Sequence, residues 1–413
     1  MKVAIVAEYY PRAADPVLGV WAHRQALAAR DAGADVRVLV LHRPVPPAAA
    51  VRGRDLQAAL VPLRQPAEAE LDGIAVRYVR YLSPPRPRAY GSWGAWAAPG
   101  LRRALRELRA EWGYDLVHAH YAVPAGDAVR RAQPRAPLVV SVHGGDVLAT
   151  VHRGPRARGS VETALRHARL VLANSAHTAE LCALHGAHDV RVVHLGADLP
   201  ESDDRVPREG GEAGRRVHEP PSIATVGHLV GRKRHADVVR ALWTLRDRHP
   251  DLRYVVVGDG PEREPLRALA ESLGVSERVE LRGQLPPAEA LAQAWRAAAF
   301  VMPSVDEAFG VAYVEAMAAG VPAIGSRGEG GPEEIAAAGA GIRLVPPGDV
   351  EALAGELHRL LSDARWAREL GAAARATVEG AFTWERCGRE TVAAYEAALA
   401  GGGHRPARTR PDR

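Results

Sequence analysis

Two glutamates, Glu307 and Glu315, lie eight residues apart in the segment EAFGVAYVEAMAAGVP, where a strand is expected to end and a helix to begin. Glu307 precedes the expected helix and Glu315 lies on its second turn, so their carboxylates can contact two parts of one ligand. The backbone N–H groups near Phe309, Gly310 and Val311 would meet an anion between them. This arrangement suits a sugar joined to a phosphate, although each glutamate alone also fits an ordinary helix charge.

A second candidate is Lys233, in the segment GHLVGRKRHADVV. The chain holds 54 Lys and Arg side chains, and its lysines are Lys2 and Lys233. A lysine offers a compact charge on a flexible stem, which suits a phosphate cluster better than a planar guanidinium. Lys233 follows an expected strand and precedes a helix that opens near His235, where open α/β sheets bind ligands. A phosphate contact is therefore expected, with a solvated turn as the alternative.

The composition places the chain among globular proteins with two or three domains. It has 413 residues and is 47% hydrophobic, which is ample for packed cores. Cys182 and Cys387 show no metal-ligand spacing and fit a reducing cytosol. The start, MKVAIVAEYYPR, is typical of a core strand rather than a signal peptide, and no run of apolar residues is long enough to span a membrane. We therefore expect a cytoplasmic protein.

The charge is uneven along the chain. Residues 1–200 carry 26 basic and 17 acidic side chains, a net charge of +9, against 28 basic and 32 acidic side chains beyond, a net charge of −4. A basic first half favours an anionic partner, such as the inner face of a membrane, a phosphorylated lipid or an acidic polymer. No nucleic-acid-binding motif accompanies it, so no nucleic acid is expected. A proteome rich in arginine is the alternative explanation.

Short β-branched runs alternate with amphipathic helical stretches along most of the chain. VAIVAEY, DVRVLVL and PLVVSVH are examples in the first half, and SIATVG, RYVVVGDG and AFVMPS in the second. Between the halves lies a stretch rich in Gly, Pro and charge that has no apolar period, which is typical of a linker. The pattern predicts an α/β fold of two Rossmann-like, doubly wound parallel-sheet domains facing each other across a cleft.

Several ordered motifs resemble the family-four glycosyltransferases of GT-B fold. These are EAFGVAYVEAMAAGVP, GDGPE at residues 258–262, GEGGPEEI at 328–335 and LVPPGD at 344–349. The opening strand and helix, the segments SVHGGD and ANS, and the closing segment FTWERCGRETVAAYEAAL are similar to the same family. The resemblance implies a retaining transferase that moves a sugar from a UDP- or GDP-sugar to a carbohydrate or lipid-linked acceptor, in cell-envelope polysaccharide or glycolipid synthesis.

The resemblance also implies the domain boundaries. Residues 1–200 would form the acceptor-binding domain and residues 222–382 the nucleotide-sugar-binding domain, joined by a linker over 201–221. A helix at about 383–400 would pack back on the first domain, and residues 401–413 would form a disordered tail. The proline-rich stretch between Arg43 and Pro66 is expected to be a long loop.

Residue roles follow from the same resemblance. Glu307 corresponds to the glutamate that binds sugar hydroxyls near the reacting carbon, and His143, in HGGD, to the acceptor-side histidine near the site of transfer. Glu315 corresponds to the glutamate that holds the ribose hydroxyls. Arg282 and Gly283 lie where the family holds the base through its backbone.

The expected diphosphate contacts are cations and backbone groups that precede or open helices: Gly19, His228, Arg232, Lys233, Phe309, Gly310 and Val311. Two of them depart from the family pattern. The glycine pair of the first loop is reduced to Gly19 in DPVLGV, and the usual arginine after VG is His228. No D-x-D motif is present, so we expect neither a metal ion nor another cofactor, with Arg232, Lys233 and backbone N–H groups stabilising the diphosphate.

Two other functions remain as alternatives at this point. A nucleotide-sugar epimerase can share the two-domain architecture, and a non-catalytic module could use the basic first half to bind a membrane or polyanion. The spacing of Glu307 and Glu315 argues against the first, and their combination with Lys233 against the second. His118 and His120, in VHAH, share one strand face, but without a third ligand packing is favoured over a metal site.

Overall fold

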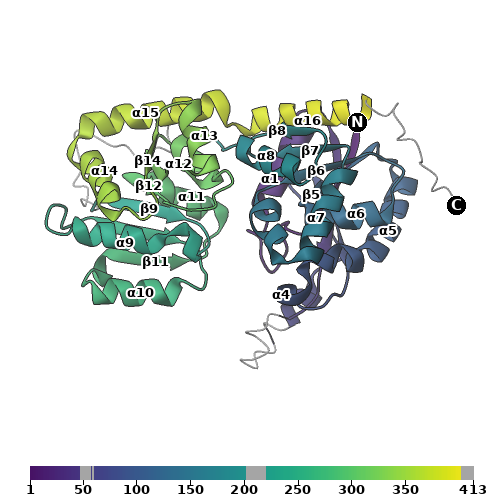
Figure 1. Ribbon diagram of the computed structural model, residues 1–413, viewed down its shortest axis with the longest axis horizontal. Coiled ribbons are helices and arrows are strands. Elements are labelled where there is room, and N and C mark those ends of the chain that lie inside the picture. The colour runs from purple at the N-terminus through teal and green to yellow at the C-terminus, as the bar shows by residue number, and fades with distance from the viewer. Residues whose placement is uncertain (47–56, 58–59, 201–219, 401–413) are drawn as a thin grey trace. The chain divides into compact units, whose positions relative to one another are not determined.

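The computed structural model describes residues 1–46, 57, 60–200 and 220–400. The chain folds into two compact units (Figure 1): unit 1 comprises Met1–His194 and the chain from Cys387 onward, and unit 2 comprises Leu195–Arg386. Nearly all of the expected linker over 201–221, the expected tail over 401–413 and part of the expected loop between Arg43 and Pro66 lie outside the described residues.

Unit 1 is built on an eight-stranded sheet with the strand order β3-β4-β2-β1-β5-β6-β7-β8. Neighbouring strands are parallel except for the antiparallel pair β3–β4. The central strands are buried along their length, as expected for parallel strands covered on both faces. The strands are β1 (Lys2–Ala7), β2 (Asp35–His42), β3 (Glu68–Leu71), β4 (Ile74–Arg80), β5 (Leu116–His120), β6 (Leu138–Val142), β7 (Leu170–Ala173) and β8 (Val190–Val192).

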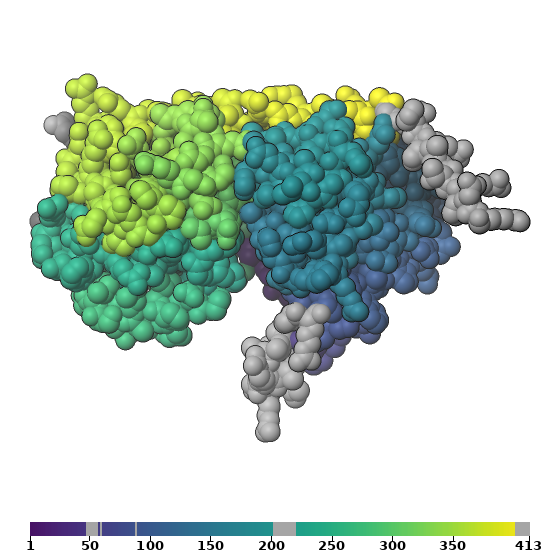
Figure 2. Space-filling model, in the orientation of Figure 1, coloured from purple at the N-terminus to yellow at the C-terminus, as the bar shows by residue number. Residues whose placement is uncertain are grey.

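Helices cover both faces of this sheet. One face packs on α5 (Trp93–Glu111), α6 (Asp127–Ala132) and α7 (Pro155–His167) in a single apolar cluster, and Figure 2 shows the outer surface of these helices in blue to teal. On the other face lie α1 (Val20–Asp31) and α16 (Trp384–Ala400). A Cβ atom on Gly388 of α16 would lie 2.1 Å from the carbonyl oxygen of Ala28, so only glycine lets these two helices approach so closely.

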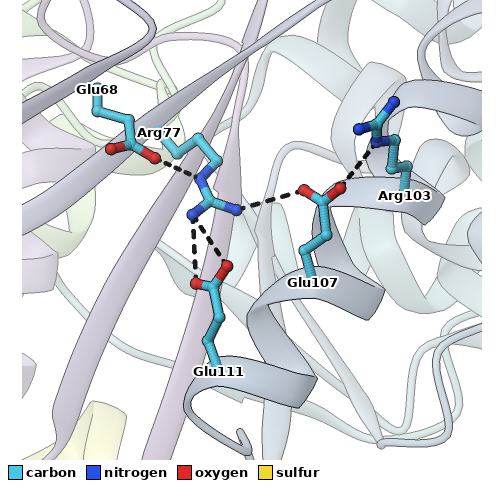
Figure 3. Close-up of polar contacts among 5 residues, drawn as sticks. All are labelled: Glu68, Arg77, Arg103, Glu107 and Glu111. Carbon is cyan, nitrogen blue, oxygen red and sulfur yellow. Dashed lines mark hydrogen bonds and ion pairs between the residues drawn. The ribbon is translucent and has the colours of Figure 1, made fainter.

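An ion-pair network joins the β3–β4 hairpin to α5 (Figure 3). The Arg77 guanidinium on β4 lies 2.9 Å from the Glu68 carboxylate on β3, and 3.6 and 3.2 Å from those of Glu107 and Glu111 on α5. Glu107 also pairs with Arg103, at 2.8 Å. Single exposed pairs contribute little to stability, but one guanidinium shared by three carboxylates restrains the hairpin against the helix.

Unit 2 is built on a fully parallel six-stranded sheet with the strand order β11-β10-β9-β12-β13-β14. The order places β9 and β12 side by side, although 72 residues lie between Val226, which ends β9, and Ala299, which begins β12. The strands are β9 (Ser222–Val226), β10 (Arg253–Val257), β11 (Val279–Gly283), β12 (Ala299–Val301), β13 (Ala323–Ser326) and β14 (Ile342–Val345).

Both faces of this second sheet are covered as well. One face packs on α9 (His235–Thr244), α10 (Arg263–Ser272) and α14 (Val350–Ser362). The other packs on α11 (Pro287–Arg296) and on α12 (Val311–Ala318), whose Tyr313 ring lies 5.7 Å from that of Phe300 on β12. The remaining helices of unit 2 are α13 (Gly330–Ala338) and α15 (Ala364–Ala381). The expected α/β fold with two doubly wound, Rossmann-like parallel sheets is confirmed. Within the described ranges, no helix is long and apolar enough to cross a membrane.

Candidate active site

The predicted residues of unit 2 lie after the carboxyl ends of β9 and β12. The segment after β9 leads through Arg232 and Lys233 into α9, and the segment after β12 leads through Glu307 into α12. A backbone hydrogen bond of 2.8 Å from Val305 N–H to the Arg232 carbonyl joins the two segments. Because adjacent parallel strands end at the same edge of a sheet, residues far apart in sequence meet here.

Lys233 and Glu307 form a buried ion pair. Lys233 Nζ lies 2.6 Å from Glu307 Oε2, and the two residues are only 9% and 8% exposed. Arg232 Nη1 approaches the same carboxylate oxygen to 3.6 Å. Sequence analysis predicted all three residues as site members, with Arg232 and Lys233 at the diphosphate and Glu307 at the sugar, but it did not predict that they contact one another.

The charges in this group determine each other's protonation. Burial lowers the pKa of Lys233, and the attraction of Glu307 opposes that shift in part. Burial by itself would raise the pKa of Glu307, but the charges of Lys233 and Arg232 outweigh it and hold that pKa below its ordinary value. Glu307 is therefore an ionised carboxylate at neutral pH, next to two cationic side chains.

The start of α12 lies on the same segment. Gly310 precedes the helix with φ 89°, and a Cβ atom there would lie 2.4 Å from the Tyr313 ring, so both backbone and space require glycine. The N-cap residue is Gly310, which has no side chain to cap the helix. The first N–H groups of the helix, which include that of Val311, have no partner inside it. The Phe309 side chain is buried against Phe382, so this residue offers a ligand only its backbone.

Glu329 holds the Glu307 segment in place and was missed as a functional residue. Its Oε2 accepts a hydrogen bond of 3.0 Å from Glu307 N–H, and Gly331 N–H donates to the Glu307 carbonyl at 3.2 Å. The available signal was the motif GEGGPEEI, which supplied resemblance but no role. These two bonds fix the main chain of Glu307 from both sides.

The residues predicted to bind the nucleotide lie on elements at and near this edge of the sheet. Glu315 is half-buried on α12, where its carbonyl accepts a 2.9 Å hydrogen bond from Trp295 Nε1. Arg282 and Gly283 end β11, two strands from β9. The Arg282 side chain is exposed and pairs with Glu280 at 2.5 Å, and the Gly283 carbonyl accepts from Gly258 N–H at 2.8 Å.

The turn after β9 depends on the glycines of GDGPE, another signal that sequence analysis left without a role. A Cβ atom on Gly258 would lie 1.9 Å from the Gly227 carbonyl oxygen, and one on Gly260 2.3 Å from the Leu229 carbonyl oxygen. The backbone of this turn can therefore lie directly against GDGPE. His228, within the turn, is exposed and accessible to a ligand.

Gly19 and His143, the predicted residues of unit 1, lie near each other. Gly19 precedes α1 with φ 67°, and a Cβ atom there would lie 2.2 Å from the backbone carbon of Tyr9. The glycine thus brings the start of α1 against the end of β1. Trp21, in the first turn of α1, places its ring 6.3 Å from that of His143.

His143 is half-buried and lies beside the buried His118 and His120, at the ends of β5 and β6. Its Nε2 lies 3.0 Å from His120 Nδ1, with the rings stacked, and burial lowers the pKa of His143 to about 3. His118 bonds to Tyr395 on α16 and to Ser141, each at 2.7 Å. Within the described ranges, no three His, Cys, Asp or Glu side chains gather so that they could hold a metal ion. His143 is therefore a neutral imidazole. His118 is packed in the interior and hydrogen-bonded to Tyr395 and Ser141.

Asp146, the last residue of HGGD, is a further buried group. Sequence analysis named this motif but assigned no role to Asp146. It is fully buried and accepts hydrogen bonds from Ala122 N–H at 2.9 Å and Val123 N–H at 3.2 Å. Burial raises its pKa to about 7, although these two bonds oppose the shift. Asp146 therefore connects the segment after β6 to the segment after β5.

Comparisons with known proteins match both units. Residues 18–201 match the family model Glycosyltransferase Family 4, and residues 212–377 match Glycosyl transferases group 1. The chain is 31% identical over 384 residues to D-inositol 3-phosphate glycosyltransferase from Thermobifida fusca (strain YX), over 84% of each chain. Sucrose-phosphate synthase from Thermosynechococcus elongatus is 22% identical, with a TM-score of 0.76 over 97% of this chain and 99% of its own. Anabaena HepE in complex with UDP-glucose is 19% identical, with a TM-score of 0.68 over 96% and 100%.

The two parallel-sheet units and these structural neighbours show that the protein has the GT-B fold. The family follows from the sequence matches, because a relative at 31% identity is covered over 84% of its length. The chain belongs to the family-four glycosyltransferases. This decides against the epimerase and against the non-catalytic module.

Removing one partner of the buried pair should destabilise unit 2. Lys233→Met leaves Glu307 buried without its closest cation, and we expect a loss of about 3–5 kcal/mol in the free energy of unfolding. The double variant Lys233→Met/Glu307→Gln removes that uncompensated charge and should recover part of the loss. Calorimetric unfolding measures the free energy of unfolding of both variants.

The matched control is Arg365→Met, whose side chain is 85% exposed in a surface pair with Glu369 on α15. It should change stability by less than about 0.5 kcal/mol. A single variant as stable as this control, or a double variant less stable than the single one, would contradict the prediction.

Proposed function

We propose that this chain is a retaining glycosyltransferase that takes a UDP- or GDP-sugar as donor and needs no metal ion. The observation that carries the proposal is the buried contact of Lys233 with Glu307 beside the start of α12. Breaking a sugar–phosphate bond places negative charge on the departing diphosphate and partial positive charge on the anomeric carbon. Cations and helix N–H groups stabilise the first charge, and a carboxylate stabilises the second.

Lys233 is assigned to the diphosphate together with Arg232 and the N–H groups at Gly310 and Val311. Lys233 is paired with Glu307 before the donor binds. On binding, the diphosphate would replace Glu307 as the partner of the Lys233 ammonium group, which leaves the Glu307 carboxylate free to face the sugar. The exposed His228 lies on the turn after β9 and supplies one further contact to the phosphates. These assignments need no large movement within unit 2, since all of these groups lie on two neighbouring segments.

The nucleotide and the acceptor are assigned to the remaining predicted residues. Glu315 binds the ribose hydroxyls, and the backbone of Arg282 and Gly283 binds the base. Gly19 lets the first loop approach the phosphates, and neutral His143 hydrogen-bonds on the acceptor side. The acceptor oxygen bonds to the anomeric carbon on the face that the diphosphate leaves, so the configuration is retained, and the hydroxyl proton passes to the departing phosphate oxygen.

For the setting of this reaction, we propose a carbohydrate or lipid-linked acceptor of cell-envelope polysaccharide or glycolipid synthesis, with peripheral attachment to the inner face of the membrane. Support comes from the net charge of +9 over residues 1–200 and from Leu82 and Trp96, which are 68% and 51% exposed in unit 1. Sedimentation with anionic vesicles should decrease as salt screens the attraction. Equal sedimentation with neutral vesicles would contradict it.

Chelation and product stereochemistry test the reaction class. Transfer from a UDP- or GDP-sugar, selected by the thermal shift that each donor produces, should continue in EDTA because cationic side chains stabilise the diphosphate. NMR of the glycosidic proton should show the donor's anomeric configuration in the product. Activity that returns only with added metal, or an inverted product, would contradict the proposal.

Substitutions of the two glutamates should change different kinetic constants. Glu307→Gln removes the carboxylate that faces the reacting carbon, and we expect kcat to decrease about 100-fold or more. Glu315→Gln weakens a ribose contact that is the same in ground and transition states, so KM for the donor should increase with little change in kcat. The exposed Glu369→Gln is the control. If both site variants change KM alone, Glu307 is only a binding residue.

A further inference from the structure

Three arginines and three aromatic rings gather near the carboxyl ends of β1, β2 and β4 in unit 1. We call this set the arginine–aromatic cluster: Arg43, Arg86, Arg153, Tyr9, Tyr90 and Trp93. Arg86 begins the short helix α4 (Arg86–Ala89), Arg43 directly follows β2, and Tyr9 lies two residues beyond β1. Open α/β sheets bind their ligands at this edge, so the position is one where substrate is expected.

The guanidinium groups are stacked on the rings. Arg86 Cζ lies 4.2 Å from the centre of the Tyr90 ring and 5.2 Å from that of Tyr9. Arg153 Cζ lies 5.3 Å from the Tyr90 ring, and Arg43 Cζ 5.0 Å from the Trp93 ring. A stacked guanidinium is held in orientation by its face while N–H groups that are not already bonded remain able to donate to an anion. In Arg43, Nε and Nη2 already donate to Ser83, so an anion would be met by the rest of that guanidinium. Arg86 is 39% exposed and Arg153 is exposed, so solvent and ligands reach both.

The cluster has more positive than negative charge. Glu8 is the carboxylate that faces it: Oε2 lies 3.9 Å from Arg86 Nη2 and accepts a 3.0 Å hydrogen bond from the Tyr90 hydroxyl. Burial raises the pKa of Glu8, although Arg86 and the hydrogen bond from Tyr90 oppose that shift. Within the described part of the chain, neither Arg43 nor Arg153 has an ion pair with a carboxylate. Like charges held together repel, so an anion from outside would relieve the excess.

Two unsatisfied polar atoms border the cluster. Arg12 Nη2 donates to the Glu8 carbonyl at 2.6 Å, but Arg12 Nε is buried and, among the described residues, has no hydrogen-bond partner. The same holds for the hydroxyl of Tyr81, whose ring lies 6.2 Å from that of Trp93. Buried polar atoms are nearly always hydrogen-bonded, so these two atoms leave donor capacity unused beside the cluster.

Ring contacts connect the cluster to His143 within unit 1. The Tyr121 ring lies 5.3 Å from the His143 ring and 5.1 Å from the Tyr9 ring, and Tyr9 contacts Arg86. A small molecule with a hydroxyl group at His143 can therefore extend along an aromatic surface to the guanidinium groups. Tyrosine rings suit the apolar faces of sugars, while guanidinium groups suit phosphate oxygens.

We propose that the acceptor of this enzyme carries a phosphate group, held by Arg43, Arg86 and Arg153, while its reacting hydroxyl lies at His143. The inference rests on the proposed function, because it names the substrate class of the same reaction. A phosphate is favoured over a carboxylate, since its oxygens can accept from more than one guanidinium at once. The phosphate belongs either to a soluble sugar phosphate or to a lipid headgroup.

Direct binding tests this proposal and separates the two sources. With UDP saturating the donor site, and at constant ionic strength, calorimetry measures the affinity for glucose 6-phosphate and for glucose. Flotation measures binding to phosphatidylcholine vesicles with and without phosphatidylinositol. Binding of glucose 6-phosphate but not glucose supports a soluble phosphate, and binding only to the vesicles with phosphatidylinositol supports a headgroup. Binding of neither phosphate probe overturns the proposal.

Variants locate the site. Arg153→Gln and Arg86→Gln should each weaken the phosphate probe at least about tenfold, the loss expected for one charge-assisted contact. Arg153 is exposed, so its variant should keep the wild-type melting temperature even if the loss of Arg86 disturbs Glu8. The control Arg103→Gln removes an equal charge from α5, where Arg103 is 79% exposed and pairs with Glu107 (Figure 3). Equal affinity in Arg153→Gln and Arg103→Gln would overturn the proposal.

Donor binding distinguishes this inference from the proposed function. The thermal shift caused by UDP reports on Lys233 and its neighbours in unit 2 and should be unchanged in Arg153→Gln. If UDP binds but neither phosphate probe does, the inference fails and the proposed function stands. If the phosphate probe binds through Arg153 and neither UDP nor GDP binds, the anion site stands and the proposed donor is wrong.

Discussion

The buried ion pair of Lys233 with Glu307 is the interaction on which the proposed donor site depends. Two charges leave water only when their mutual attraction and further hydrogen bonds repay the cost of desolvation. Here the Arg232 guanidinium adds to the attraction, and Glu329 and Gly331 hold the main chain of Glu307. In the proposed mechanism, this pair keeps the two opposite charges that sugar transfer requires in contact until the diphosphate binds.

Sheet topology makes this pair possible. Lys233 follows β9 and Glu307 follows β12, and these strands are neighbours only because the chain order reverses in the middle of the sheet. Glycines then bring the backbones close: Gly258 and Gly260 lie against the turn after β9, and Gly310 opens α12 with a positive φ. A side chain at any of these glycines would push the neighbouring segments apart. The positions of the charged side chains therefore depend on these uncharged glycines.

Unit 1 uses the same edge of its sheet in a different way. Instead of one neutralised pair, it holds stacked guanidinium groups that the Glu8 carboxylate faces, and buried or half-buried imidazoles that are neutral because charging them would cost desolvation. Tyr9 and Tyr121 join these two groups. The basic charge that the sequence assigns broadly to residues 1–200 is thus concentrated, in part, at the position where a parallel sheet binds its ligand.

The sequence by itself determined the two βα arrays, the membership of Glu307, Lys233 and His143 in motif segments, and the family, because apolar periodicity, turn glycines and short motifs are local properties of the chain. It did not determine which of these residues contact one another. Lys233 and Glu307 are 74 positions apart, and His143 contacts His120 across two strands whose pairing is set by the sheet. The protonation states could not be predicted from the sequence either. The pKa of Glu307 or Asp146 depends on burial and on neighbouring groups that come together only after folding. The arginine–aromatic cluster was hidden for the same reason: Arg43, Arg86 and Arg153 are ordinary surface arginines in the sequence, and only the tertiary structure stacks them on common rings.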